Sequence, residues 1–226
     1  MRADGINSVV PNETVGQLPA GVPDNRNRYD TEGRSVYFAE SKIAAFAEVL
    51  QAFRVHVLSL AKDAAAIGMS VADYRKQVTK ESHELGNPGP GEIPVEWQMN
   101  RSLYRVQMPK SDWWVRIDAG ETLTALTNAF QWPQLLTLSD VAGENRSLTT
   151  RIAQLMRLAV LDNGTLPLGI DFPSKTGYGR CWAWFNRRLD DGLSAGRNDP
   201  ELVEELNVNV PELHQLCTQW DLELIK

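Results

Sequence analysis

The stretch SVYFAESKIAAFAEVLQAF, residues 35–53, holds the two patterns that decide the fold class. Residues 35–39 are rich in aromatic and β-branched side chains, which predicts a strand. Ser41 is a favourable N-cap residue, and apolar side chains then recur every three or four positions from residue 42 to about residue 66, which predicts an amphipathic helix. We therefore expect a strand followed at once by a long helix.

The rest of the chain predicts strands and helices in an irregular order. Strands are expected over residues 103–108, 113–118, 166–172 and 181–186, and helices over residues 71–84, 120–130, 145–161 and 211–220. The two kinds of element do not alternate regularly, and the sequence has no GxGxxG or Walker A loop. We therefore expect an α+β fold, with a mixed β-sheet and flanking helices, rather than a doubly wound parallel sheet.

Loop-forming residues suggest how the domain is organised. Residues 1–27 are rich in Gly, Pro, Asn and Asp and predict a loop or an extended arm, and LGNPGPGEIP at residues 85–94 predicts a second loop. We expect one domain over residues 1–226, with an insertion near residues 62–98 and a C-terminal helical tail over residues 199–226.

The composition argues against several classes of protein. The net charge of −6 disfavours a nucleic-acid binder that relies on a basic field, and we expect Arg180, Arg187 and Arg188 to lie on a solvated strand edge or turn. The two cysteines and three histidines form no metal-binding or disulfide motif. No apolar stretch approaches the roughly 20 residues of a membrane span, and residues 1–21 lack a signal-peptide core. These features predict a cytoplasmic protein without metal.

Glu48 is the only charged residue in IAAFAEVLQAF, residues 43–53. On a helix it points roughly away from the large apolar stripe. Its neighbours on that side are small or medium-sized and apolar: Ala44, Ala45, Ala52 and Val55. A carboxylate in such surroundings leaves room for a ligand, although a glutamate on the solvent-facing side of a helix gives the same pattern.

Arg28 and Ser174 are weaker candidates when each is taken alone. Arg28 lies in DNRNRYD, residues 24–30, and a guanidinium can hold a phosphate through two parallel hydrogen bonds. Ser174 lies in GIDFPSKTGYGR, residues 169–180, where the glycines let a backbone approach a ligand closely. A solvated loop arginine and a turn serine fit the same sequences. No GxSxG motif is present, which disfavours a serine hydrolase.

In chain order, these residues resemble the RES-domain family, which is named for an arginine, a glutamate and a serine. NRYDTEGRSVYFAESKIAAFAEVL, residues 27–50, is similar to the family's arginine–aromatic pair, glycine turn, tyrosine-bearing strand and glutamate-bearing helix. GIDFPSKTGYGRCWAWFN, residues 169–186, is similar to its later strand–turn–strand segment. The family positions fall on Arg28, Tyr37, Glu48 and Ser174. Residues 1–20 lack the family's early aromatic–arginine pair, and the similar LYRV comes only at residues 103–106.

The resemblance implies a fold like that of the diphtheria-toxin type of ADP-ribosyltransferase. It implies a bacterial toxin of a toxin–antitoxin pair that takes NAD as its substrate and breaks the nicotinamide–ribose bond. Glu48 and Arg28 would be the catalytic residues, with Arg28 on the pyrophosphate, Tyr37 against the nicotinamide and Ser174 on the carboxamide or a ribose oxygen. The partners implied are an Xre-type antitoxin protein and, in a homodimer, a second copy of the chain.

Three outcomes of that chemistry stay open. The acceptor of the ADP-ribosyl group is water in a glycohydrolase, phosphate in a phosphorylase and a protein side chain in an ADP-ribosyltransferase. A catalytically inactive RES fold that serves as an interaction protein is the alternative from another class. The seven tryptophans suit such an interface as well as they suit a core.

Overall fold

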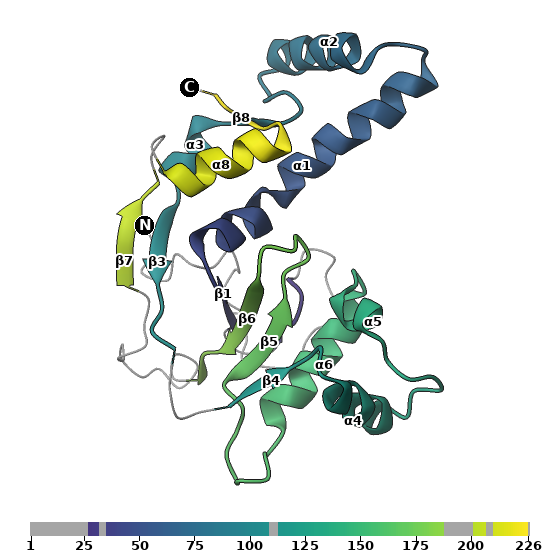
Figure 1. Cartoon of the computed structure of the whole chain (residues 1–226), viewed down its shortest axis with the longest axis vertical. Coiled ribbons are helices and arrows are strands. Elements are labelled where there is room, and N and C mark those ends of the chain that lie inside the picture. Colours follow the sequence, from purple (N-terminus) through teal and green to yellow (C-terminus); the bar gives the residue numbers. More distant parts are fainter. Residues whose placement is uncertain (1–26, 32–34, 109–112, 188–200, 207–209, 226) are drawn as a thin grey trace. The chain divides into compact units, whose positions relative to one another are not determined.

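The structure, a computed structural model, describes residues 27–31, 35–108, 113–187, 201–206 and 210–225. The chain forms two compact units, which we call unit 1 (Ser41–Leu103 with Leu202–Lys226) and unit 2 (Arg2–Glu40 with Tyr104–Glu201). Together they give a mixed α+β architecture with a mixed sheet and flanking helices (Figure 1). The loop or arm expected over residues 1–27 lies outside the described residues apart from Asn27, and so does Arg188.

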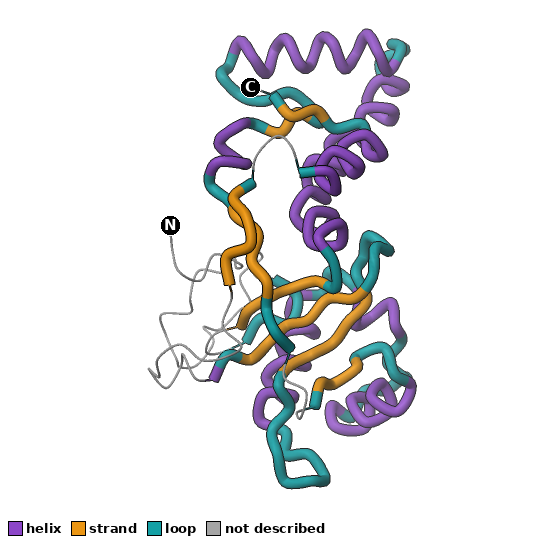
Figure 2. The backbone as a smooth tube through the Cα atoms, turned by 60° about the vertical axis from the view of Figure 1, so that its left-hand side comes forward, coloured by secondary structure: helices purple, strands orange, loops and turns teal. Residues whose placement is uncertain are grey.

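Unit 2 is built on a four-stranded mixed sheet with the order β1-β6-β5-β4. The strands are β1 (Ser35–Ala39), β4 (Trp114–Arg116), β5 (Gly169–Pro173) and β6 (Arg180–Phe185). β6 runs antiparallel to both β1 and β5, whereas β4 is parallel to β5. The helices of this unit are α4 (Gly120–Phe130), α5 (Leu138–Ala142) and α6 (Arg146–Leu158). Figure 2 shows these strands as the orange tubes of one sheet.

Alternation of side chains gives the sheet of unit 2 two distinct faces. Ile170 on β5 lies opposite Ala183 on β6, which in turn lies opposite Tyr37 on β1, so these three point to one face. The hydrophobic cluster that includes Ile170 and Ala183 also contains Leu126 of α4, Val141 of α5 and Ile152 of α6. We call this the core face, because α4, α5 and α6 cover it.

The other face of the sheet is aromatic. Phe38 stacks on Trp182 with ring centroids 5.6 Å apart and meets Trp114 edge-on at 5.8 Å. Phe38 and Trp182 are also register partners across β1 and β6. We call this the aromatic face.

Gly169 lets β5 and β6 approach each other closely at the start of the strand. A Cβ atom at this position would lie 2.0 Å from the carbonyl oxygen of Ala183 and 2.9 Å from the ring of Trp114. No side chain fits there without moving a strand, so the packing of the sheet requires glycine at this position.

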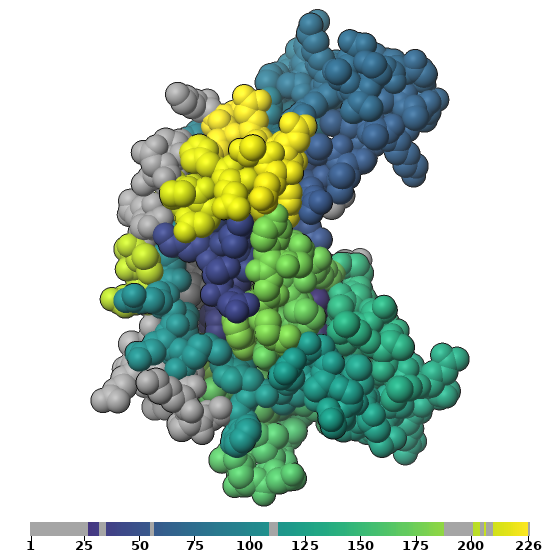
Figure 3. All heavy atoms as spheres, in the orientation of Figure 1, coloured from purple at the N-terminus to yellow at the C-terminus, as the bar shows by residue number. Residues whose placement is uncertain are grey.

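Unit 1 is organised by the long helix α1 (Lys42–Ala66), which packs against α8 (Pro211–Trp220) and α2 (Val71–Glu84). Ser41 caps α1 by accepting a hydrogen bond from the backbone N–H of Ala44. The buried residues of the two helices include Phe46 and Leu50 on α1 and Leu213 and Leu216 on α8. The space-filling view shows α8, in yellow, in contact with the blue surface of α1 (Figure 3).

Short elements complete unit 1 and the boundary between the units. They are β2 (Glu92–Ile93), α3 (Val95–Met99), β3 (Ser102–Arg105), β7 (Glu201–Glu205) and β8 (Glu223–Leu224). β2 pairs in parallel with β8, and β3 pairs with β7. The chain passes from one unit to the other within β3 and again within β7.

The elements predicted from the strongest patterns are confirmed. The bounds of β1, α1, α2, α4 and α8 are those expected from the sequence. The expected strands over 103–108 and 113–118 are shorter in the structure, and the helix expected to residue 161 ends at Leu158, where Ala159 turns to an extended conformation. The tail expected to be helical also contains β7 and β8. The single domain with an insertion near 62–98 stays a prediction.

α1 also bears on the expectation that the chain has no membrane span. Within the described residues, it is the one helix long and apolar enough to cross a membrane by length and composition, with a mean hydropathy of 1.4 over an 18-residue window. The sequence lacks an uninterrupted apolar run of about 20 residues, but that did not exclude a helix of this kind. The many alanines of α1 keep its mean hydropathy high despite the charged residues. A long core helix passes the same test, so this observation is weak evidence for a membrane span.

Candidate functional site

Arg28 is a buried arginine that packs against two aromatic rings. The residue is only 7% exposed. Its guanidinium carbon lies 5.1 Å from the ring centroid of Phe172 and 6.0 Å from that of Tyr29. The two rings themselves contact each other at 5.0 Å. A solvated loop arginine, which the sequence left open, does not describe this residue.

Tyr29 fixes the backbone beside Arg28. Its φ angle is 64°, which is an uncommon conformation for a residue other than glycine. Its hydroxyl donates a 2.7 Å hydrogen bond to the carbonyl oxygen of Val141 on α5. Burial raises the pKa of this hydroxyl far more than the neighbouring Arg28 lowers it, so Tyr29 stays a neutral donor. The segment before β1 is therefore tied to the helical layer.

Tyr37 lies on the same face of the sheet as the ring beneath Arg28. Phe172 pairs with Cys181, and Tyr37 pairs with Ala183 two residues further along β6, so their side chains share the core face. Tyr37 is half-buried and packs against the hydrophobic cluster of unit 2. The structure thus brings Arg28 and Tyr37 to one side of the sheet.

Ser174 begins the turn that joins β5 to β6. Its hydroxyl oxygen lies 2.5 Å from that of Thr176 and accepts the backbone N–H of Thr176 at 3.1 Å. Its own N–H donates to the carbonyl oxygen of Gly179 at 2.9 Å. These bonds are typical of a turn serine, the alternative that the sequence left open. The expected ligand contact of Ser174 stays a prediction.

Glu48 belongs to unit 1, whereas Arg28, Tyr37 and Ser174 belong to unit 2. It lies on α1 and is half-buried. Of the small residues expected around it, Ala44 is fully buried and Ala52 is exposed. The carboxylate therefore lies at the border between the covered and the open sides of this helix.

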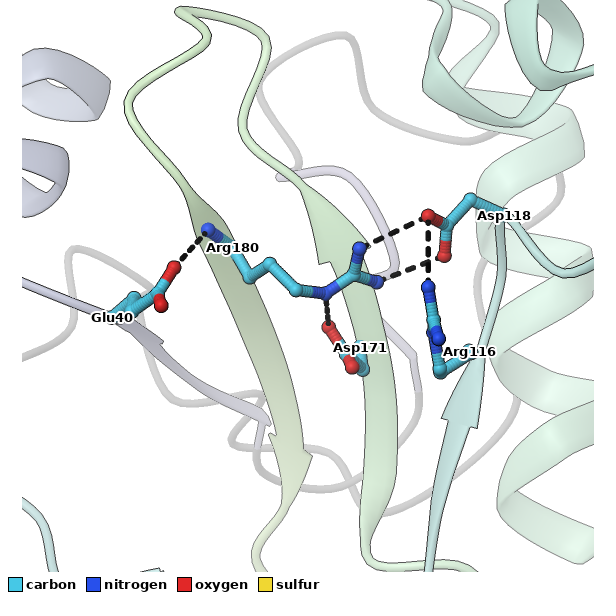
Figure 4. Close-up of polar contacts among 5 residues, drawn as sticks. All are labelled: Glu40, Arg116, Asp118, Asp171 and Arg180. Atoms are coloured by element: carbon cyan, nitrogen blue, oxygen red, sulfur yellow. Dashed lines mark hydrogen bonds and ion pairs between the residues drawn. The ribbon is translucent and has the colours of Figure 1, made fainter.

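A charged network that the sequence did not suggest is centred on Arg180 of β6 (Figure 4). Its guanidinium donates two hydrogen bonds to Asp118, of 3.0 and 2.8 Å, and one to Asp171, of 2.6 Å. Arg116 lies 3.7 Å from Asp118, and Glu40 accepts the backbone N–H of Arg180 at 3.0 Å. Arg116, Asp171 and Arg180 lie on β4, β5 and β6, and Glu40 and Asp118 lie just after β1 and β4 (Figure 4).

The two aspartates of this network respond to it in opposite directions. The bonds from Arg180 hold the pKa of Asp118 below its usual value. Burial raises the pKa of Asp171 by more than the single bond from Arg180 lowers it. Arg180 in turn has a raised pKa, chiefly because of Asp118, and stays charged. The network is therefore a fixed positive charge enclosed by carboxylates.

The expectation of a solvated basic edge is wrong for the two arginines of that group that the structure describes. Arg180 is enclosed by Asp118 and Asp171, and Arg187 donates hydrogen bonds of 2.7 Å to the carbonyl oxygens of Pro167 and Arg157. A signal was present in the sequence, because Asp171 is the only charge in the apolar strand GIDFP. The same kind of signal drew attention to Glu48.

Within the described part of the chain, no cluster of three or more His, Cys, Asp or Glu side chains is arranged to hold a metal ion. Cys181 and Cys217 are both buried, and neither is part of a disulfide bond. Burial raises the pKa of Cys217 to about 11, so this thiol is not an activated nucleophile at neutral pH.

Neither a protein-family model, nor a curated protein, nor a solved structure matches this chain. The candidate site is therefore defined by its own chemistry. That chemistry is a buried guanidinium packed against aromatic rings, with a tyrosine on the same face of the sheet.

Proposed function

We propose that this chain consumes NAD by breaking its nicotinamide–ribose bond, on a fold of the ADP-ribosyltransferase type. The observation that carries the proposal is Arg28, which is buried and held by Phe172 and Tyr29 rather than solvated in a loop. The ordered resemblance of residues 27–50 and 169–186 to the RES-domain family supplies the substrate. It also supplies the expected setting, a bacterial toxin with an Xre-type antitoxin, and the composition supplies the expected cytoplasmic location.

Breaking the nicotinamide–ribose bond requires few catalytic groups. When the bond between C1′ of the ribose and the nicotinamide nitrogen breaks, nicotinamide leaves as a neutral molecule and needs no general acid. The ribose carbon becomes cationic, as in glycoside cleavage, and a negative charge held near it lowers the barrier. Water then adds at C1′ and releases a proton, which gives ADP-ribose.

Each residue has one role in this proposal. Glu48 supplies the negative charge and accepts hydrogen bonds from the ribose hydroxyls. Arg28 holds the pyrophosphate through its planar guanidinium. Tyr37 packs against the nicotinamide, and Ser174 bonds the carboxamide or a ribose oxygen. Holding the scissile bond in one orientation accounts for a further part of the acceleration.

The test is an NAD-consumption assay on the wild type and on Glu48→Gln. The substitution preserves the shape of the side chain and removes its charge, so we expect kcat to fall about 10²- to 10³-fold. Asp63→Asn is the matched control, because it removes one negative charge from an exposed position on the same helix. We expect its rate to equal that of the wild type. Equal rates for Glu48→Gln and the wild type, or no NAD loss at all, would overturn the proposal.

Product analysis in the same assay identifies the acceptor. Free ADP-ribose indicates hydrolysis, and a phosphorylated ADP-ribose that forms only with added phosphate indicates phosphorolysis. A labelled protein band after incubation with labelled NAD and lysate indicates ADP-ribosyl transfer. The bond that breaks is the same in the three cases.

A further inference from the structure

Glu144, in the loop between α5 and α6, holds its carboxylate between two cations. One carboxylate oxygen lies 2.6 Å from the Nη2 atom of Arg146, in the first turn of α6. The other forms an ion pair with Lys175, which directly follows Ser174 in the β5–β6 turn. The two cations come from segments that are about 30 positions apart in the sequence, so the fold brings them to one point.

The three side chains differ in exposure in an informative way. The side chains of Lys175 and Arg146 are 17% and 23% exposed, whereas that of Glu144 is 73% exposed. The cations are therefore set into the protein, and the carboxylate reaches them from the solvent side. The Glu144 carboxylate is itself largely exposed, so it regains hydration when it leaves, and its release costs less than breaking a fully buried ion pair.

The same cations lie beside the residues of the candidate site. Arg146 and Arg28 both lower the pKa of Tyr29, whose hydroxyl bonds to Val141 just before this loop. Lys175 adjoins the Ser174 turn in sequence. Arg146 and Lys175, which both contact Glu144, therefore lie next to residues of the candidate site.

We propose that Arg146 and Lys175 form a seat for a phosphate group, which Glu144 occupies when no ligand is bound. A guanidinium and an ammonium that converge on two oxygens are the donors that recognise phosphate. A pyrophosphate carries more negative charge than a carboxylate and offers more acceptor oxygens, so it displaces Glu144. The ligand's phosphate comes either from a dinucleotide or from free inorganic pyrophosphate.

The experiment is isothermal titration calorimetry of inorganic pyrophosphate with the full chain. Glu144→Gln removes the competing charge, and we expect it to bind pyrophosphate about tenfold more tightly than the wild type. Lys175→Gln removes one of the two cations of the seat, and we expect it to bind pyrophosphate at least tenfold more weakly than the wild type. Glu84→Gln is the matched control, since Glu84 forms an exposed ion pair with Lys80 on α2, and its affinity should equal that of the wild type.

Equal pyrophosphate affinities for the wild type and Glu144→Gln would overturn the proposal, as would unchanged binding in Lys175→Gln. Thermal melting of each variant checks that it is folded. A second titration with ADP-ribose distinguishes the sources. If ADP-ribose binds and responds to the same substitutions, the seat takes a dinucleotide phosphate; if only the inorganic ion does, it takes free pyrophosphate. The readout does not depend on NAD cleavage. The proposed function can therefore be wrong while this phosphate seat exists, and the seat can be absent while the proposed function is right.

Discussion

At the scale of single residues, the planar geometry of Arg180 explains why an arginine stands at this position of β6. Two nitrogens meet both oxygens of Asp118, and Nε meets Asp171 from another direction. A lysine ammonium is a single point charge and cannot make both sets of bonds from one position. The side chains of Arg180, Asp118 and Asp171 are 13% to 27% exposed, so water replaces a lost bond among them only in part.

Arg180→Lys should therefore destabilise the protein by about 1–3 kcal/mol, between the values typical of exposed and of buried ion pairs. Urea unfolding measures this as a lower midpoint at an unchanged slope. Arg105→Lys is the control, because the Arg105–Glu201 pair is about 70% exposed on both sides and should cost less than about 1 kcal/mol. Equal losses for the two substitutions would show that the Arg180 network has no special geometry.

The burial and the contacts of single residues were the features that the sequence predicted least well. The pattern around Glu48 identified an isolated charge, but the structure leaves that residue only half-buried. The alternative that Arg28 is a solvated loop arginine is wrong. The sequence could not exclude it, because Phe172, the ring that supports the guanidinium, lies far away in the chain. Long-range partners of this kind leave no local pattern, so burial of an arginine cannot be derived from its neighbours in the chain.

At the scale of elements, local signals determined where the long helices and the first strand begin and end. α1 begins after Ser41, and α8 begins at Pro211, both of which are favoured start positions. The elements missed from the sequence have five residues or fewer, and they include β2, α3, α5 and β8. β2 exists because it pairs with β8, more than a hundred positions away, and such pairing has no signature in a two-residue segment.

The N-cap of α1 gives a test at this scale. Ser41→Ala removes the acceptor for the N–H of Ala44, and we expect a loss of about 1 kcal/mol, or roughly 2–4 °C in Tm. Ser147→Ala is the matched control, because Ser147 is exposed inside α6, where Asn145 is the capping residue. Thermal melting followed by circular dichroism makes the comparison. A drop for Ser147→Ala as large as that for Ser41→Ala would contradict the capping role.

At the scale of the whole molecule, the two units share one chain in an interleaved order. Residues of unit 1 stand between β1 and β4, so the sheet of unit 2 forms only after sequence-distant strands meet.

Each unit also contains an acidic side chain whose pKa is lowered by its bonds. Burial acts to raise the pKa of Glu92 in unit 1, but the bonds from His83 and from the N–H of Gly89 lower it by more. Asp118 is the corresponding group in unit 2.

These carboxylates make the stability depend on pH below neutrality. A group with a lowered folded-state pKa contributes stability above its unfolded pKa, which is about 4, and this contribution disappears as the pH falls through the folded value. Acid should therefore destabilise the protein progressively below about pH 4. Asp118→Asn removes one such group, so the difference in urea midpoint between pH 7 and pH 3 should shrink. Asp162→Asn, at an exposed position, should keep the wild-type difference. An unchanged difference in Asp118→Asn would contradict this account.

The left-handed backbone of Tyr29 has a consequence for the thermodynamics of recognition. An arginine in a mobile loop loses about 2 kcal/mol of rotamer entropy when a ligand immobilises it. Here the left-handed backbone of Tyr29 and its tether to Val141 accompany the packing of Arg28 against aromatic rings. The ordering cost is thus part of folding instead of binding. A ligand that reaches this guanidinium meets a side chain that is already immobilised, so binding carries little of this rotamer-entropy cost.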